Sequence, residues 1–187
     1  MNEFALIQKY FKKLTYNNPS ALNLNDDVFF DKKNNVVVSS DTYVEGVHFL
    51  NFKKPDLVIK KIIRSSISDL YCKGVKPKFI FIGASGNNIS FSKKNMELIF
   101  KSLKQEQKKY KIKLSGGDTT KSNKTTFTIT SLGYSKKIVQ RNKCKNNDDI
   151  YVTGNLGDSY LGLLLLKKKL FLRNTKERKY FIHKYYK

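Results

Sequence analysis

Short apolar runs typical of buried β-strands alternate with amphipathic helix patterns along most of this chain. β-branched and aromatic runs predict strands, and apolar residues three or four apart predict helices. Such interleaving, without an internal repeat, predicts an α/β fold in which helices flank a mixed sheet. The predicted strands are 36–38, 79–84, 125–132 and 150–154, and the predicted helices are 4–14, 55–70, 96–103, 157–170 and 175–186.

The composition is that of a folded but strongly basic protein. Its 187 residues are 40% hydrophobic, which is enough for one domain with a core and part of a second. The net charge of +22 would suit nucleic acid. The cations are dispersed, however, and nearly all are lysine, so the charge indicates mainly a solvated lysine coat. A basic nucleic-acid-binding protein stays open as an alternative.

Cysteine usage and hydropathy bear on the compartment. Cys72 and Cys144 stand far apart in unrelated contexts and predict neither a disulfide nor a zinc site. The N-terminal segment reads as an amphipathic helix rather than a secretory signal. The longest apolar run, residues 161–166, is too short to cross a bilayer. We therefore expect a soluble, cytoplasmic protein without membrane contact.

Four aspartates lie in small polar motifs, each at or near the end of a predicted element: Asp27, Asp41, Asp69 and Asp118. We expect these chain ends to converge. Two carboxylates about 4 Å apart repel by roughly 4 kcal/mol at a surface-like dielectric, so such a cluster needs a cation or added protons. Mg²⁺ fits best, because it prefers oxygen ligands and bridges to nucleotide phosphates.

Each motif also has a structural alternative. Asp26 or Asp27 alone would usually serve a turn or a helix cap, and Gly116-Gly117-Asp118 is equally consistent with a tight turn or a phosphate cradle. Asp69 is harder to explain structurally, because an acid near a helix C-terminus opposes the macrodipole. His48 as a lone residue would more often be structural, and so would His183.

Taken in order, these segments resemble the thiamine-monophosphate kinase family of the aminoimidazole ribonucleotide synthetase-like superfamily. The most specific part, residues 39–49, is similar to the signature S-T-D-x-x-V-x-G-x-H-F. Supporting matches are Ser68-Asp69-Leu70, Gly116-Gly117-Asp118-Thr119-Thr120 and residues 151–158. The ordered set is far more specific than any single motif.

The resemblance implies transfer of the ATP γ-phosphoryl group to thiamine monophosphate, which gives thiamine diphosphate. It also implies a homodimer whose paired N-terminal sheets form a β-barrel at the nucleotide site. Phosphoryl transfer needs alignment and charge neutralisation, so we assign no general base and no catalytic residue. The implied site residues are Asp27, Ser39, Ser40, Asp41, Asp69 and Asp118 for magnesium, Gly117, Asp118 and Arg141 for ATP, and His48 for the thiamine phosphate.

The sequence departs from the family pattern in three places. Asn23-Leu24-Asn25 replaces a Gly-x-Gly, and asparagine tolerates the left-handed conformation such a loop needs. Tyr71-Cys72-Lys73 replaces small residues and methionine, which alters the packing there. Family members also continue into a second α/β domain.

We therefore expect an ATP- and magnesium-binding domain over 1–140, the beginning of a truncated domain over 141–187, and impaired activity. Another ATP-dependent kinase or synthetase of the superfamily is the alternative.

Overall fold

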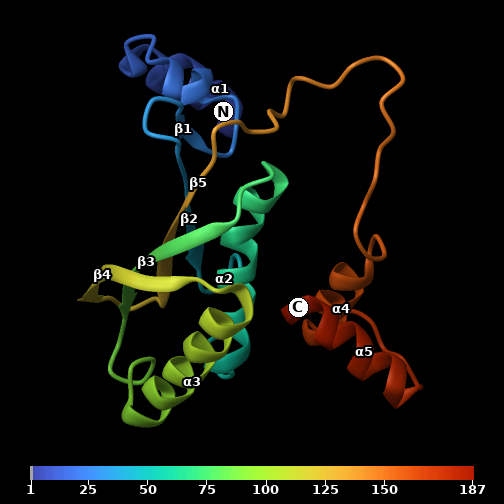
Figure 1. Ribbon diagram of the computed structural model, residues 1–187. Helices are drawn as coiled ribbons and strands as arrows, with labels where there is room; N and C mark the ends of the chain where they lie inside the picture. The colour runs from blue at the N-terminus through green and yellow to red at the C-terminus, as the bar shows by residue number, and fades with distance from the viewer. Residues whose placement is uncertain (1) are drawn as a thin grey trace. The chain divides into compact units, whose positions relative to one another are not determined.

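The computed structural model describes residues 2–187, which form two compact units, Met1–Lys143 and Cys144–Lys187. The first unit contains all the strands in the described part of the chain, and the second contains two helices (Figure 1). Each unit is described by itself below. No helix among residues 2–187 combines the length and the apolar character that a membrane crossing requires.

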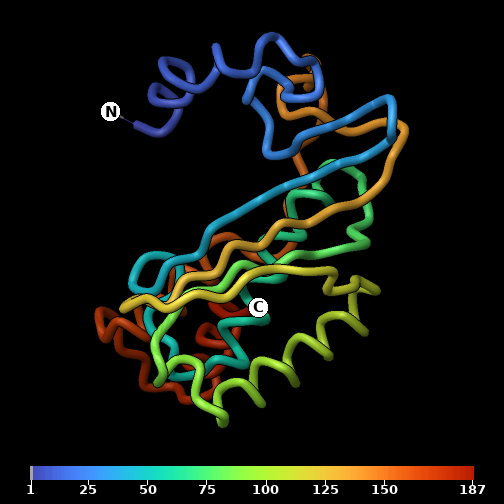
Figure 2. The backbone as a smooth tube through the Cα atoms, turned by 90° about the vertical axis from the view of Figure 1, so that its left-hand side faces the viewer, coloured from blue at the N-terminus to red at the C-terminus, as the bar shows by residue number. Residues whose placement is uncertain are grey.

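The first unit is built on a five-stranded mixed sheet. Its strands run in the order β1-β2-β5-β3-β4, side by side in Figure 2. All neighbours are antiparallel except β3 and β4, which are parallel and joined through a helix. The predicted mixed α/β fold is confirmed, and this sheet by itself is not a closed barrel. The strand bounds are β1 Phe29–Asp31, β2 Val36–Val44, β3 Pro77–Gly86, β4 Lys113–Lys121 and β5 Thr126–Tyr134.

Two long helices, α2 (Pro55–Cys72) and α3 (Lys93–Tyr110), lie on one face of the sheet (Figure 1). α2 begins with Pro55 at its first position, where a missing N–H costs nothing. Its apolar stripe is fully buried and packs beneath β2 and β5. Arg64 on α2 holds the buried carboxylate of Glu106 on α3 through two hydrogen bonds of 2.7 Å. This bidentate pair fixes the two helices to each other.

The opposite face of the sheet is not covered by any helix of the first unit. Along β2 and β5 buried residues alternate with partly or fully exposed ones, as expected when one face packs on helices. On the uncovered face Ser40 pairs with Thr130 and Thr42 pairs with Thr128, with oxygen separations of 2.8 and 2.9 Å. This face also carries a group of apolar side chains: Phe29, Val38, Phe79, Phe81, Leu132 and Tyr134.

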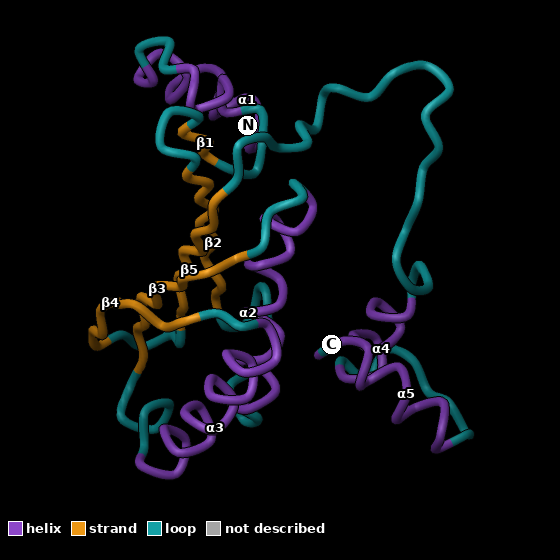
Figure 3. The backbone as a smooth tube through the Cα atoms, in the orientation of Figure 1, coloured by secondary structure: helices purple, strands orange, loops and turns teal. Residues whose placement is uncertain are grey.

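The chain starts with a series of short helical turns, drawn purple in Figure 3, instead of one regular helix. The amphipathic pattern predicted a helix over 4–14, and the structure has α1 (Glu3–Leu6), a π-helical turn (Ile7–Phe11) and a 3₁₀ turn (Lys12–Thr15). A second 3₁₀ segment, Pro19–Leu24, follows. Asn23 has φ 57°, so the left-handed conformation expected there is present, although Leu22 and Leu24 adopt it too.

The second unit is a hairpin of α4 (Asp158–Leu166) and α5 (Thr175–Tyr186). Tyr180 on α5 donates a hydrogen bond of 2.8 Å to Asp158 at the start of α4. The predicted strand 150–154 was wrong: these residues are irregular, and Ile150 and Tyr151 are almost fully exposed. A strand needs a neighbour for its backbone hydrogen bonds, and residues 144–187 supply only helices.

Candidate functional site

The centre of the candidate site is a pair of aspartates where α2 crosses β2. Asp41 lies inside β2, not at its end as the sequence suggested, and on the same face as buried Ser39 and Tyr43. Asp69 projects from the last turns of α2, as predicted. The Ser39 hydroxyl donates a hydrogen bond of 3.0 Å to Oδ2 of Asp69, which ties the helix to the strand.

Burial and nearby carboxylates disfavour the charged forms of this pair. Burial raises the pKa of Asp69 to about 6; the charges of Asp41 and Asp27 add to the rise, whereas the Ser39 hydrogen bond opposes it. Burial likewise raises the pKa of Asp41, although hydrogen bonds from Tyr43 and Asp69 act in the other direction. Neighbouring carboxylates whose ionised forms are disfavoured by burial are the arrangement expected of a cation site.

The turn after β2 places His48 beside this pair. Gly46 has φ 83°, a conformation that glycine adopts readily, and the turn returns Phe49 to the core. Nδ1 of His48 accepts a hydrogen bond of 3.0 Å from the N–H of Val44, so Nε2 carries the proton of the neutral ring. The ring meets Tyr43 edge-on at 5.9 Å, and the Tyr43 hydroxyl donates to Asp41 at 3.2 Å. His48 therefore presents a donor next to the acidic pair.

Asp26 and Asp27 lie on the loop before β1 and are paired with two cations. The ammonium group of Lys73, at the C-terminal end of α2, forms a salt bridge with Asp26 and lies 3.6 Å from Oδ2 of Asp27. The guanidinium of Arg141 forms an ion pair with Asp27, and its backbone N–H donates to Asp26 at 3.1 Å. Burial opposes ionisation of Asp26, but Lys73 and the two backbone donors hold its pKa below the usual value.

The expected convergence of all four aspartates does not occur within one chain. Gly117 and Asp118 lie on the edge strand β4, three strands away from Asp41 through the register Asp41, Ile129, Ile82, Gly117. At roughly 4.8 Å per strand, the separation between Asp41 and Gly117 across the sheet is about 14 Å. Asp118 and Ser40 also face the uncovered side of the sheet, opposite to Asp41. Thus Asp27, Ser39, Asp41, Asp69 and His48 come together, whereas Ser40, Gly117 and Asp118 do not join them, and Arg141 lies with Asp27.

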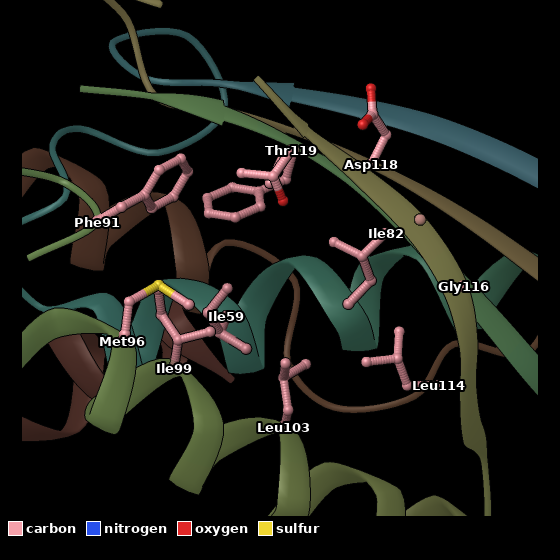
Figure 4. Close-up of a pocket in the computed structure, with 13 residues that line it drawn as sticks. Ile59, Ile82, Phe91, Met96, Ile99, Leu103, Leu114, Gly116, Asp118 and Thr119 are labelled. Carbon is pink, nitrogen blue, oxygen red and sulfur yellow. The ribbon is translucent and has the colours of Figure 1, made fainter. Parts of the chain in front are cut away.

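The Gly116-Gly117-Asp118 motif is extended strand, so the tight turn considered from the sequence is absent. Thr119 faces a cavity of about 700 Å³ between the sheet and α3, and Asp118 points away from α3 (Figure 4). The walls are mostly apolar, with Ile82 and Leu114 from the sheet and Met96 and Leu103 from α3. The motif therefore borders an apolar cavity on one face and the open sheet on the other.

The chemistry of the donor set fits Mg²⁺, although the donors are not gathered around one point. Among residues 2–187 no three Asp, Glu, His or Cys side chains form a group that could hold a metal ion. Mg²⁺ is commonly bound through one or two carboxylates and retains several waters. Asp41 and Asp69 with the Ser39 hydroxyl supply such a set, and Asp27 is close enough to affect the pKa of both carboxyls.

Two contributors to the site were missed by sequence reasoning. Tyr43 could have been found, because residues two apart on a strand share a face and Asp41 was already singled out. Lys73 gave no such signal, since one lysine among many at a helix end is normally solvated.

The whole chain is similar to known proteins. A thiamine-monophosphate kinase of Buchnera aphidicola subsp. Schizaphis graminum is 37% identical over 194 residues, covering 100% of this chain and 58% of that protein. The structure of AaThiL complexed with AMPPCP and TMP matches with a TM-score of 0.84 at 26% identity, over 97% of this chain and 57% of the other. The thiamine monophosphate kinase of Aquifex aeolicus matches with a TM-score of 0.81 at 26% identity, over 97% and 58%.

The match covers only part of longer proteins, since this chain spans less than two thirds of the length of those relatives. The family model for AIR synthase related protein, N-terminal domain, matches residues 24–135, which include β1 to β5, both long helices and the acidic pair. This chain therefore belongs to the AIR synthase related protein family, of which it carries the N-terminal domain.

Proposed function

We propose that this chain is the ATP- and magnesium-binding part of a thiamine-monophosphate kinase, which transfers the γ-phosphoryl group of ATP to thiamine monophosphate. The main supporting observation is the half-buried Asp41 and Asp69 pair with the His48 donor beside it. The relatives that match along the chain carry this activity in their names, and AaThiL was solved with AMPPCP and TMP.

In this proposal Asp27, Ser39, Asp41 and Asp69 hold magnesium on the helix-covered face. Ser40 and Asp118 would serve ions on the uncovered face. When bound, magnesium neutralises the charge of the phosphate oxygens. The chain's own residues position the reactants: Nε2–H of His48 donates to the thiamine phosphate, and Arg141, now paired with Asp27, would turn to the nucleotide. No proton transfer is assigned to a side chain.

Gly117 on β4 lies beside the apolar cavity. The sheet itself requires glycine at this position, because a Cβ atom there would overlap the carbonyl of Ile82 on β3. The adjoining apolar cavity could receive a base, and its volume of about 700 Å³ is within the range of ligand pockets. We assign Gly117 and Asp118 to ATP on this basis.

We also propose that two copies pair through the uncovered sheet face. This face carries exposed Phe29, Phe81 and Tyr134, and contiguous apolar surface on a monomer commonly marks an interface. Pairing would close two open sheets into the barrel that the family resemblance implies. We assign residues 1–140 to the nucleotide-binding domain and 141–187 to the beginning of the second domain.

The decisive measurement is magnesium-dependent ligand binding to the purified chain. Mg²⁺ with AMPPCP, or with thiamine monophosphate, should raise the melting temperature of the wild type. Asp41→Asn should need at least a tenfold higher ligand concentration for the same increase. Asp149→Asn, which removes the same charge from an exposed site in the second unit, should respond like the wild type. An equal response from Asp41→Asn, or none from the wild type, would reject the proposal. A response only to another phosphorylated metabolite would favour the alternative substrate.

A further inference from the structure

Lys73 occupies an unusual position for a lysine. It caps the C-terminal end of α2, and its backbone carbonyl accepts a hydrogen bond of 3.1 Å from Val139. Its side chain is only 6% exposed and that of its partner Asp26 only 4%. Lysine is almost never buried unless it is paired, so the pair with Asp26 holds the ammonium group in place.

The buried ammonium group also reaches a carboxylate of the candidate metal site. Its Nζ lies 3.6 Å from Oδ2 of Asp27, while Arg141 binds the other oxygen of that carboxylate. Two protein cations thus balance the two acids of the loop. The carboxyl of Asp69, in contrast, has a pKa raised first by burial and then by Asp41 and Asp27, and Lys73 is the smallest of the influences that lower it.

We infer that Lys73 is a positioning residue that serves as a fixed counter-ion on the Asp27 side of the metal site. This inference rests on the proposed function, because it takes Asp27 as a magnesium ligand. Lys73 holds the 25–28 loop against α2 when no metal is bound. It also weakens the binding of a divalent ion, since such an ion at Asp27 meets a positive charge only a few ångströms away.

The test is Lys73→Met in the full chain. Methionine is long, flexible and uncharged, so it can fill the same space without the ammonium group. We expect Mg²⁺ to bind about tenfold more tightly by calorimetry, and Mn²⁺ to show the same change by electron paramagnetic resonance. In EDTA the melting temperature should fall below that of the wild type, and saturating Mg²⁺ should narrow the gap. Lys104→Met removes one charge from the exposed face of α3 and should change neither quantity.

A second comparison keeps the test valid if Lys73→Met does not fold. Asp26→Asn/Lys73→Met removes both members of the buried pair and leaves Asp27 without the ammonium group; it is compared with Asp26→Asn alone. Unchanged or weaker Mg²⁺ affinity in Lys73→Met and in the double variant overturns the inference. So does an unchanged melting temperature of Lys73→Met in EDTA. If the wild type binds neither Mg²⁺ nor Mn²⁺, the proposed function fails as well, which is a distinct result.

Discussion

The environment of Asp41 and Asp69 shows how burial controls the charge of individual side chains. Both carboxyls are partly buried between α2 and β2, and burial is the main reason that both pKa values are raised. The Ser39 and Tyr43 hydroxyls donate to the ionised forms, but they do not offset burial. The metal-free pair is therefore less acidic than aspartates in water.

The raised pKa of Asp69 predicts a pH effect on stability. Its folded-state pKa of about 6 exceeds the ordinary aspartate pKa of 3.8, so the folded protein retains this proton where the unfolded chain has lost it. The protonated carboxyl therefore stabilises the folded state fully below about pH 4, and this contribution is lost as the pH rises through about 6. In EDTA, the free energy of unfolding of Asp69→Asn, relative to that of the wild type, should increase by about 1 kcal/mol as the pH is raised from 4.5 to 7.5. This figure allows for solvent screening of the partly exposed carboxyl.

Urea unfolding of both proteins at the two pH values measures this change. Asp149→Asn, in the second unit, should show no such trend and serves as the control. A difference between Asp69→Asn and the wild type that does not vary with pH would contradict the prediction.

Part of this residue-scale arrangement could be predicted from the sequence. A helix-end aspartate and a strand aspartate were expected to converge, and Asp41 and Asp69 do so. That Ser39, Ser40 and Asp41 cannot all point to one site also follows from the sequence, because neighbours on a strand face opposite sides. The contacts of Lys73 with the 25–28 loop depend on how α2 ends against that loop, and no local pattern encodes this.

At the scale of secondary-structure elements, the β3-α3-β4 unit best shows the limits of pattern reasoning. Gly116-Gly117-Asp118 has the composition of a turn, yet it lies in the middle of β4. Its glycines are needed there because the backbones of β3 and β4 approach closely. A local propensity cannot reveal a parallel partner more than thirty residues away. For Ile150 to Val152 the error was the reverse, because a strand was predicted and none is present. The β propensity of these residues is high, but the second unit supplies no neighbouring strand.

The close approach of β3 and β4 predicts that Gly117→Ala destabilises the sheet. Gly117 has φ 154°, and a Cβ atom there would clash with the backbone carbonyl of Ile82, which cannot rotate away. We expect a loss of about 1 to 3 kcal/mol in the free energy of unfolding, measured by urea denaturation.

Gly83→Ala on the adjacent strand is the matched control. Its Cβ would meet Thr128 at an ordinary 3.6 Å, so the change should stay within about 0.5 kcal/mol. If Gly117→Ala proved as stable as Gly83→Ala, the close approach would have no energetic consequence.

For the whole molecule, the important asymmetry is between the two faces of the sheet. α2 and α3 cover one face, and among residues 2–143 no other helix lies on the opposite face (Figure 1). Order and spacing of apolar segments could predict the helices and the mixed sheet. They could not show which face of the sheet stays uncovered, because the alternating pattern of a half-buried strand does not say which face the helices cover.

The open face predicts a dimer that one substitution can dissociate. Phe81 lies on this face next to Gly116, so Phe81→Asp would place a charge inside the paired surface. Light scattering after size exclusion should give twice the chain mass for the wild type and the chain mass for Phe81→Asp. Phe100→Asp, an equally charged change at an exposed site on α3, should remain a dimer. A monomeric wild type, or a dimeric Phe81→Asp, would reject this interface.

The ion pairs of Asp26 and Asp27 also connect distant parts of the first unit. Asp26 and Arg141 are 115 residues apart in the chain, and Lys73 lies between them. These contacts tie the loop before β1 to the end of α2 and to the segment that follows β5. In the folded state the four side chains therefore hold three separate segments of the first unit together.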